Sequence, residues 1–277
     1  MDISKAGTVI LGDITVNRLG FGAMRITGQG VWGEPDDHDG AIAVLKRAVE
    51  LGVNFIDTAD AYGPEVSENL ICEALYPYDG VTIATKGGMT RSGPDQWAAD
   101  GRPEHLREAC EASLRRLGVD QIDLYQFHRP DPSVPFENSL RELIALKDEG
   151  KIRHLGLSNV TVEQLETARG MTEIVSVQNR YNIGDAQASA DVLDYCTQNN
   201  IAFIPWFPVG GGSDLSALQA VAERHNASLH QIALAWLLAK SPIMLPIPGT
   251  KSLEHLEENV AAAAIQLSDE DLAELNQ

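Results

Sequence analysis

The strongest constraint on the fold is an alternation of apolar and amphipathic segments that repeats along almost the whole chain. Short apolar runs, typical of strands buried in a parallel sheet, occupy residues 19–22, 53–57, 81–85, 122–127, 155–158, 174–178, 202–206 and 244–247. Segments with helical periodicity lie at 40–51, 67–75, 103–117, 136–149, 161–169, 188–199, 228–240 and 253–262. The order predicts eight βα units.

Helix start and stop signals fall between these units. Pro103 stands at a first helical position, Thr161 and Gln164 form a capping box, and Gly118 follows the end of a helical segment. The 277 residues contain neither a Pro/Ser-rich linker nor a break in composition. We therefore expect one domain, residues 1–277, of class α/β, folded as a closed (β/α)8 barrel, whose usual size is about 250 residues.

The first residues predict an addition to the barrel. Residues 9–11 and 14–16 are β-prone and are joined by Gly12-Asp13, which is the pattern of a tight hairpin. We expect this N-terminal hairpin to close the bottom of the barrel. A doubly wound sheet is the alternative fold, but residues 20–25 lack the third glycine and the directly following helix of a dinucleotide-binding turn.

Composition excludes several classes of partner. The net charge of −19 and the pI of about 4.6 would repel nucleic acid and anionic membranes. Three scattered cysteines, Cys72, Cys110 and Cys196, suit a reducing compartment and form no Cys/His cluster of metal-binding spacing. Residues 1–7 have no apolar core of a signal peptide. We expect a cytoplasmic protein without a metal, and the sequence is compatible with a monomer.

Four chemically capable side chains come at or just after the ends of neighbouring strands. Asp57 ends the second predicted strand, Tyr62 lies five residues later, Lys86 follows the third strand and His128 follows the fourth. Each residue alone has an ordinary structural explanation, such as a turn carboxylate or a packed tyrosine. Because the carboxyl ends of barrel strands meet at one rim, we expect the four side chains to converge there.

Such a cluster suits proton transfer to a carbonyl oxygen. The pKa of a free tyrosine is near 10, so donation near pH 7 asks for about 3 units of phenolate stabilisation. We expect Lys86 to supply this stabilisation and Asp57 to keep Lys86 charged. His128 would then position the carbonyl by a hydrogen bond.

Six separated stretches resemble the aldo-keto reductase superfamily: residues 52–63 (GVNFIDTADAYG), 85–88 (TKGG), 113–128, 156–159 (GLSN), 177–182 and 248–259. The resemblance implies a (β/α)8 barrel, a nicotinamide cofactor bound without a Rossmann motif, and a catalytic tetrad of Asp57, Tyr62, Lys86 and His128. Residues 30–35, 206–212 and 248–259 are most similar to bacterial pyridoxal reductase-like members.

The resemblance also implies a set of cofactor-binding residues. At the nicotinamide end they are Ala23, Met24, Ser158, Asn159, Gln178 and Trp206; along the next loop they are Phe207, Pro208, Val209 and Gly210; at the adenosine end they are Gly249, Lys251, His255, Glu258 and Asn259. Many NADP-dependent relatives have Arg where this chain has His255. We expect NADPH as cofactor, held by Lys251, with NADH left open.

The expected activity is reduction of a small aldehyde or ketone, with Tyr62 as general acid and pyridoxal as a candidate substrate. Trp32 and Trp97, in loops on the rim side, are candidates for the substrate pocket. Two alternatives remain open at this point. One is a cofactor-sensing regulatory module with little turnover, and the other is a Schiff-base aldolase using Lys86, which the neighbouring Asp57 disfavours.

Overall fold

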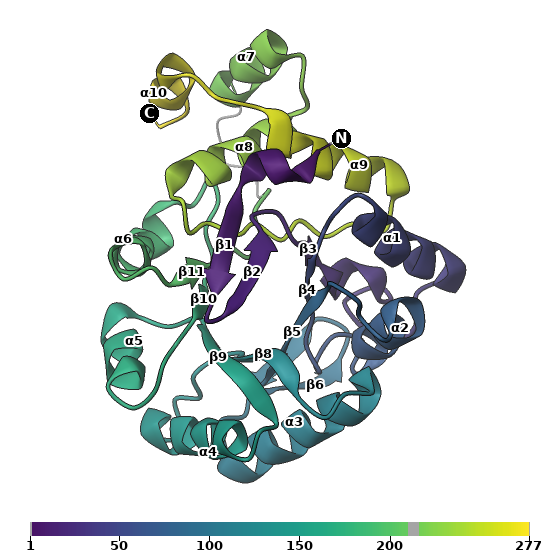
Figure 1. Ribbon diagram of the computed structural model, residues 1–277, viewed down its shortest axis with the longest axis vertical. Helices are drawn as coiled ribbons and strands as arrows, with labels where there is room; N and C mark the ends of the chain where they lie inside the picture. The colour runs from purple at the N-terminus through teal and green to yellow at the C-terminus, as the bar shows by residue number, and fades with distance from the viewer. Residues whose placement is uncertain (1, 210–215, 277) are drawn as a thin grey trace.

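The computed structural model describes residues 2–209 and 216–276. Its centre is a curled parallel sheet with the strand order β11-β10-β9-β8-β5-β4-β3, and helices surround it as an outer ring (Figure 1). The strands are β3 (Phe21–Gly22), β4 (Phe55–Asp57), β5 (Thr82–Gly87), β8 (Ile122–Phe127), β9 (Ile152–Ser158), β10 (Ser176–Gln178) and β11 (Ala202–Phe203). This architecture confirms the predicted (β/α)8 barrel fold.

The eighth position of the barrel is filled by a segment that pairs only in part. Phe203 donates to the Ile243 carbonyl at 2.9 Å and accepts from the Leu245 amide at 2.8 Å. On the other side Gly20 donates to the Pro246 carbonyl at 2.9 Å. The predicted strand at 244–247 is thus an extended bridge between β11 and β3, because Pro246 has no amide hydrogen to complete a ladder.

All eight predicted helical segments are helices. They are α1 (His38–Glu50), α2 (Val66–Leu75), α3 (Pro103–Leu117), α4 (Phe136–Asp148), α5 (Val162–Arg169), α6 (Ala190–Gln198), α8 (Leu229–Lys240) and α9 (Leu253–Ala261). Two further helices outside the eight predicted segments are α7 (Ser216–His225) and α10 (Asp269–Leu275). Short 3-10 turns are η1 (Ile3–Ala6), η2 (Ala23–Ile26), η3 (Gln187–Ser189) and η4 (Ala262–Ala264). The capping box of Thr161 and Gln164 is present as predicted.

Two hairpins lie at opposite ends of the barrel. The N-terminal hairpin of β1 (Thr8–Leu11) and β2 (Ile14–Asn17) crosses the ring at the strand start side, where Asp13 meets His154 of β9 (Figure 1). It therefore closes the bottom, as predicted. The second hairpin, β6 (Met89–Gly93) and β7 (Gln96–Ala99), follows β5 on the rim and was expected only as a loop.

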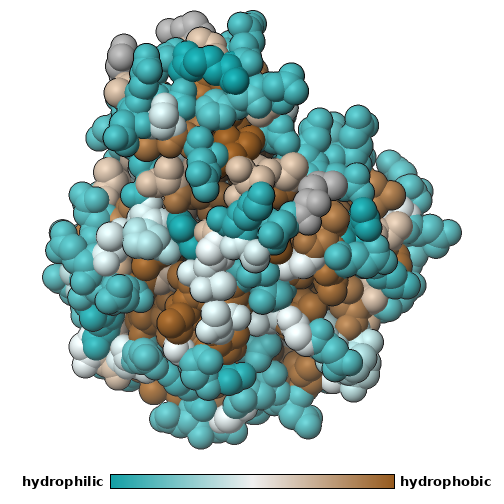
Figure 2. All heavy atoms as spheres, turned by 45° about the horizontal axis from the view of Figure 1, so that its top comes forward, coloured by the Kyte–Doolittle hydropathy of each residue, from teal (hydrophilic) through white to brown (hydrophobic). Residues whose placement is uncertain are grey.

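The surface is largely hydrophilic, whereas several large aromatic side chains lie in the interior. Figure 2 shows hydrophilic residues over most of the face that it presents, with hydrophobic residues in patches between them. The large apolar side chains Phe21, Phe55, Phe127, Phe203 and Trp236 are at most 2% exposed. No helix that the structure describes is long and apolar enough to cross a membrane.

Candidate active site

Strand register brings three of the four predicted catalytic side chains to one edge of the sheet. Asp57 is the last residue of β4, Lys86 lies one residue before the end of β5, and His128 follows β8. The amide of His128 donates to the carbonyl of Gly87 at 2.9 Å, which fixes the height of His128 against β5. The site is therefore built on parallel strands rather than on loops, with the exception of Tyr62.

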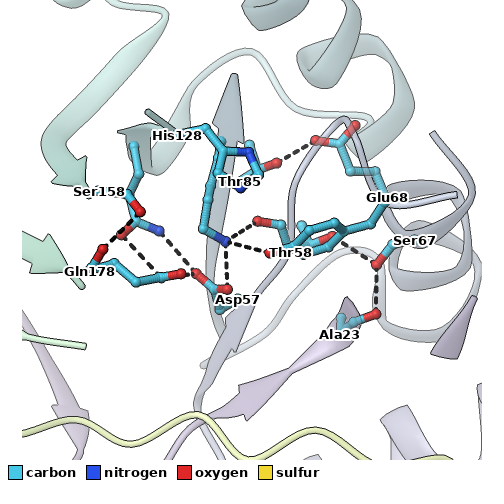
Figure 3. Close-up of polar contacts among 12 residues, drawn as sticks. Ala23, Asp57, Thr58, Ser67, Glu68, Thr85, His128, Ser158 and Gln178 are labelled. Carbon is cyan, nitrogen blue, oxygen red and sulfur yellow. Dashed lines mark hydrogen bonds and ion pairs between the residues drawn. The ribbon is translucent and has the colours of Figure 1, made fainter. Parts of the chain in front are cut away.

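The ammonium group of Lys86 is the centre of the cluster. Its Nζ donates to Oδ1 of Asp57 at 2.6 Å and to the carbonyl of Thr58 at 2.7 Å (Figure 3). It also lies 3.4 Å from Oη of Tyr62. Both ends of the Lys86–Asp57 ion pair are buried, with side-chain exposures of 0% and 2%. Because a buried pair adds little net stability, its presence here indicates a functional site.

The second oxygen of Asp57 is held by two amides. Oδ2 accepts from Nε2 of Gln126 at 3.0 Å and from Nε2 of Gln178 at 2.8 Å. Gln126 comes from β8, in register with Lys86, and Gln178 ends β10. Three donors, one of them the Lys86 ammonium, thus fix the orientation of this carboxylate, and the carboxylate in turn orients Lys86.

Burial and charge act in opposite directions on Tyr62 and Lys86. Burial would lower the pKa of Lys86, but Asp57 and then Tyr62 outweigh it, and the pKa stands above its usual value. For Tyr62, burial raises the pKa and the nearby Lys86 only partly offsets it. The expected net lowering of the Tyr62 pKa is therefore not found, because the phenol is more deeply buried than its loop position indicated. At neutral pH the phenol holds its proton and Lys86 is charged.

His128 lies edge-on to Tyr62, with ring centroids 6.0 Å apart. Burial, followed by the charges of Lys86 and Arg129, lowers its pKa well below the usual range. The imidazole is therefore neutral at pH 7. Its Nδ1 is buried without a hydrogen-bond partner among residues 2–209 and 216–276. A neutral imidazole carries one N–H, which is a donor suited to an uncharged carbonyl oxygen.

A cavity of about 590 Å³ opens above these residues. Predicted site residues that line it are Met24, Asp57, Tyr62, Trp97, His128, Ser158, Asn159, Gln178, Trp206, Phe207, Pro208, Val209 and Gly249. Lys86 lies beneath Tyr62, and Ala23 is fully buried. Trp32, at 36% exposure, is not among the lining residues that the structure describes.

The cavity wall formed by β9, β10 and the segment after β11 fits a flat ring that carries an amide. The half-buried Trp206 donates from Nε1 to Oδ1 of Asn159 at 3.1 Å, and Asn159 donates to Oγ of Ser158 at 2.9 Å. Together with Gln178 they place an aromatic face beside several amide and hydroxyl groups. An aromatic platform with polar neighbours of this kind could hold a nicotinamide ring and its carboxamide.

The remaining predicted cofactor residues lie apart from this wall. A Cβ on Gly249 would come within 2.3 Å of the Gly22 carbonyl, so the two backbones meet in a contact that admits only glycine. Lys251 and His255 are exposed at the start of α9, and Glu258 and Asn259 are half-buried further along it. Gly210 falls outside the described residues.

Sequence reasoning missed several residues around the cavity. Val31, Met89 and Asp95 line its outer wall, and the exposed Arg129 lies beside His128. The β6–β7 hairpin supplies two of these residues and Trp97. Its signal was the Gly93-Pro94-Asp95 turn between two short β-prone stretches. In the part of the chain that the structure describes, no three His, Cys, Asp or Glu side chains could hold a metal ion.

The barrel and the cluster at its rim suit an oxidoreductase, and comparisons with known proteins show that the protein is an NAD(P)-dependent one. The chain belongs to the aldo/keto reductase family, whose family model matches residues 18–277. An uncharacterized oxidoreductase of Schizosaccharomyces pombe is 55% identical over 280 residues, which cover 100% of this chain and 91% of that protein. Pyridoxine 4-dehydrogenase of Escherichia coli is 44% identical over 282 residues, which cover 98% of each protein.

Solved structures show the same architecture. A glycerol dehydrogenase from Gluconobacter oxydans superimposes with a TM-score of 0.87 at 28% identity, over 98% of this chain and 94% of that one. An aldo/keto reductase from Klebsiella pneumoniae, in complex with NADP and acetate, gives a TM-score of 0.81 at 26% identity, over 97% and 94%. Family membership implies small carbonyl substrates.

Proposed function

We propose that this protein is an NADPH-dependent reductase of aldehydes, with pyridoxal among its substrates. The observation that carries the proposal is the contact chain from Asp57 through Lys86 to Tyr62 at the floor of a 590 Å³ cavity. Support for pyridoxal comes from the 44% identity to pyridoxine 4-dehydrogenase.

Tyr62 donates the proton in this proposal. Its raised pKa keeps the phenol loaded with a proton before the reaction, and the Lys86 ammonium 3.4 Å away stabilises the phenolate that remains afterwards. Asp57 keeps Lys86 charged and aimed. The neutral His128 gives a hydrogen bond to the substrate oxygen and so orients the carbonyl towards Tyr62.

NADPH would be held along the wall opposite the β6–β7 hairpin. Trp206 would stack on the nicotinamide ring, and Ser158, Asn159 and Gln178 would hold its carboxamide. When bound, the reduced cofactor supplies the hydride. Lys251 at the start of α9 would pair with the 2′-phosphate, which favours NADPH over NADH.

The raised pKa of Lys86 opposes a Schiff-base role, since an attacking lysine must be neutral. The same ammonium is surrounded by a carboxylate, a carbonyl and a phenol, all of which favour the charged form. The site therefore supports proton transfer rather than covalent capture of the carbonyl.

The test is NADPH consumption with pyridoxal, benzaldehyde and propanal as substrates. We expect kcat/KM for the two aromatic aldehydes to exceed that for propanal by about ten- to a hundredfold, because burial of one ring contributes ~1 to 3 kcal/mol. Equal kcat/KM values for aromatic and aliphatic aldehydes, or no turnover of pyridoxal, would contradict the proposed substrate preference. The reduction of carbonyl compounds that the family implies would then remain. Absence of turnover with all three aldehydes would overturn the proposed function.

A further inference from the structure

One guanidinium on the rim ties together loops that are far apart in the sequence. Arg91 of β6 donates from Nη1 to the carbonyl of Val31 at 2.7 Å and to that of Ala61 at 2.9 Å. Its Nη2 donates to the Gly30 carbonyl at 2.8 Å. The loop after β3, the loop that carries Tyr62 and the β6–β7 hairpin are therefore joined at one side chain.

The other two bonds of Arg91 lie within its own hairpin. Nη2 donates to the Gly93 carbonyl at 3.2 Å, and Nε donates to the Gln96 carbonyl at 3.0 Å. Five main-chain carbonyls thus face a group that has five N–H donors. All of these acceptors are uncharged, so the arrangement is a geometric clamp rather than an ion pair.

The flat face of the same guanidinium rests on the aromatic wall of the cavity. Cζ of Arg91 lies 3.5 Å from the centre of the Trp97 ring and 5.7 Å from that of Trp32. The Trp97 ring also lies beside Tyr62 and His128, with ring centroids 6.3 and 6.5 Å away. Trp97 is therefore a neighbour both of Arg91 and of the two residues that would receive the carbonyl.

We propose that Arg91 is a positioning residue that sets substrate specificity by holding Trp97 as a fixed wall against flat aromatic aldehydes. The proposal rests on the proposed reductase function. The three joined loops fix Arg91, and Arg91 acts on the substrate only through Trp97. Tyr62 has further supports in Lys86 and in the Ser67 amide, which donates to the Tyr62 carbonyl at 3.1 Å. The proton-transfer step should consequently depend little on Arg91.

The experiment measures KM and kcat for benzaldehyde, pyridoxal and propanal in wild type, Arg91→Met, Arg91→Lys, Trp97→Ala and the double variant Arg91→Met/Trp97→Ala. In Arg91→Met we expect KM for the aromatic aldehydes to rise about tenfold and KM for propanal to change less than about twofold, because only a ring uses the aromatic wall. Arg91→Lys, with three donors for five carbonyls, should be intermediate.

The double variant shows whether Arg91 works through Trp97. We expect its KM for benzaldehyde to equal that of Trp97→Ala alone, since removing the wall removes what Arg91 positions. Arg102→Met, which removes an exposed arginine just before α3, is the matched control and should leave every KM unchanged.

Two outcomes would overturn the inference. One is a rise of KM by the same factor for propanal as for the aromatic aldehydes in Arg91→Lys. The other is a double variant whose effect is the product of the two single effects. Failure of the reductase proposal looks different, because wild type itself would then turn over none of the aldehydes. If wild type reduces benzaldehyde but not pyridoxal, the test of Arg91 proceeds unchanged with benzaldehyde.

Discussion

His128 and His154 lie at opposite ends of the same barrel and are both 8% exposed, yet their surroundings differ in kind. His154, near the start of β9, has its Nε2 2.5 Å from Oδ1 of Asp13 on the N-terminal hairpin. His128, after β8, faces Lys86 and Arg129, and its pKa is lowered by burial and then by these charges. Two equally buried histidines therefore have opposite electrostatic surroundings, a carboxylate beside His154 and cationic groups near His128.

Two arginines repeat the contrast. Arg18, after β2, donates to the carbonyls of Leu238 at 2.7 Å and Met244 at 3.1 Å, and also to that of Ser241. It ties the hairpin side of the barrel to the end of α8 and to the closing segment. Arg91 likewise donates to main-chain carbonyls on the rim, but its guanidinium also lies over the Trp97 ring, 3.5 Å from the ring centre, at the cavity. The bottom uses such contacts for closure, whereas the rim uses them to shape a site.

The strongest test of a difference in role between His128 and His154 is to make the same substitution at both. His128→Gln replaces the imidazole N–H that is proposed to orient the carbonyl with a more flexible amide whose N–H stands elsewhere, so kcat/KM for benzaldehyde should fall by about 10² or more while Tm stays close to wild type. His154→Gln should leave kcat/KM within about twofold and lower Tm by about 2 to 4 °C. Steady-state kinetics and thermal melts of the two variants measure kcat/KM and Tm and so check both predictions.

A loss of activity in folded His154→Gln, or full activity in His128→Gln, would show that catalysis is not confined to the rim end of the barrel as proposed.

Lys251 allows a test on the rim that does not involve the proton transfer. Lys251→Ala removes the proposed partner of the 2′-phosphate, so NADPH affinity should fall about ten- to a hundredfold while NADH affinity stays nearly unchanged. Fluorescence titration with both cofactors measures the two dissociation constants. Lys240→Ala, at the end of α8, is the matched control lysine. Equal losses for NADPH and NADH would remove Lys251 from phosphate recognition.

The smallest expected effect is the pH dependence of the stability that Asp13 contributes at the bottom of the barrel. Hydrogen bonds from Arg153 and then His154 lower the pKa of Asp13 to about 2. A carboxylate with a lowered folded-state pKa stabilises the fold above its unfolded value of about 3.8, and this contribution is lost as the pH falls towards 2. The Tm difference between wild type and Asp13→Asn should therefore shrink as the pH falls from 5 to 3. A Tm difference that grows below pH 4 would contradict the expected stabilisation by the ionised Asp13 carboxylate.

Strand-end positions made the proposed tetrad predictable from sequence. Asp57, Lys86 and His128 each follow an apolar run, and parallel topology brings such residues to one rim. The eighth strand was harder, because Pro246 keeps an apolar segment from forming a full ladder while still allowing it to close the barrel.

Arg91 could not have been found in this way. Its acceptors are main-chain carbonyls at residues 30, 31, 61, 93 and 96. Because every residue has a main-chain carbonyl, the residue types at these positions do not identify them as acceptors. The pKa of Tyr62 escaped prediction for a related reason. The sequence shows that a lysine is near, but the depth of burial, which decides the direction of the shift, depends on how the loops and the β6–β7 hairpin cover the phenol.

The most direct test of the account is the kcat of Tyr62→Phe with NADPH and benzaldehyde, measured beside Tyr78→Phe. Both changes remove a phenol oxygen, but that of Tyr78 donates to the Leu117 carbonyl at 2.7 Å, away from the cavity. We predict that kcat of Tyr62→Phe falls by about 10² or more with unchanged NADPH affinity, because a general acid is lost, and that kcat of Tyr78→Phe stays at the wild-type value. A Tyr62→Phe enzyme with wild-type turnover would show that Tyr62 is not the proton donor.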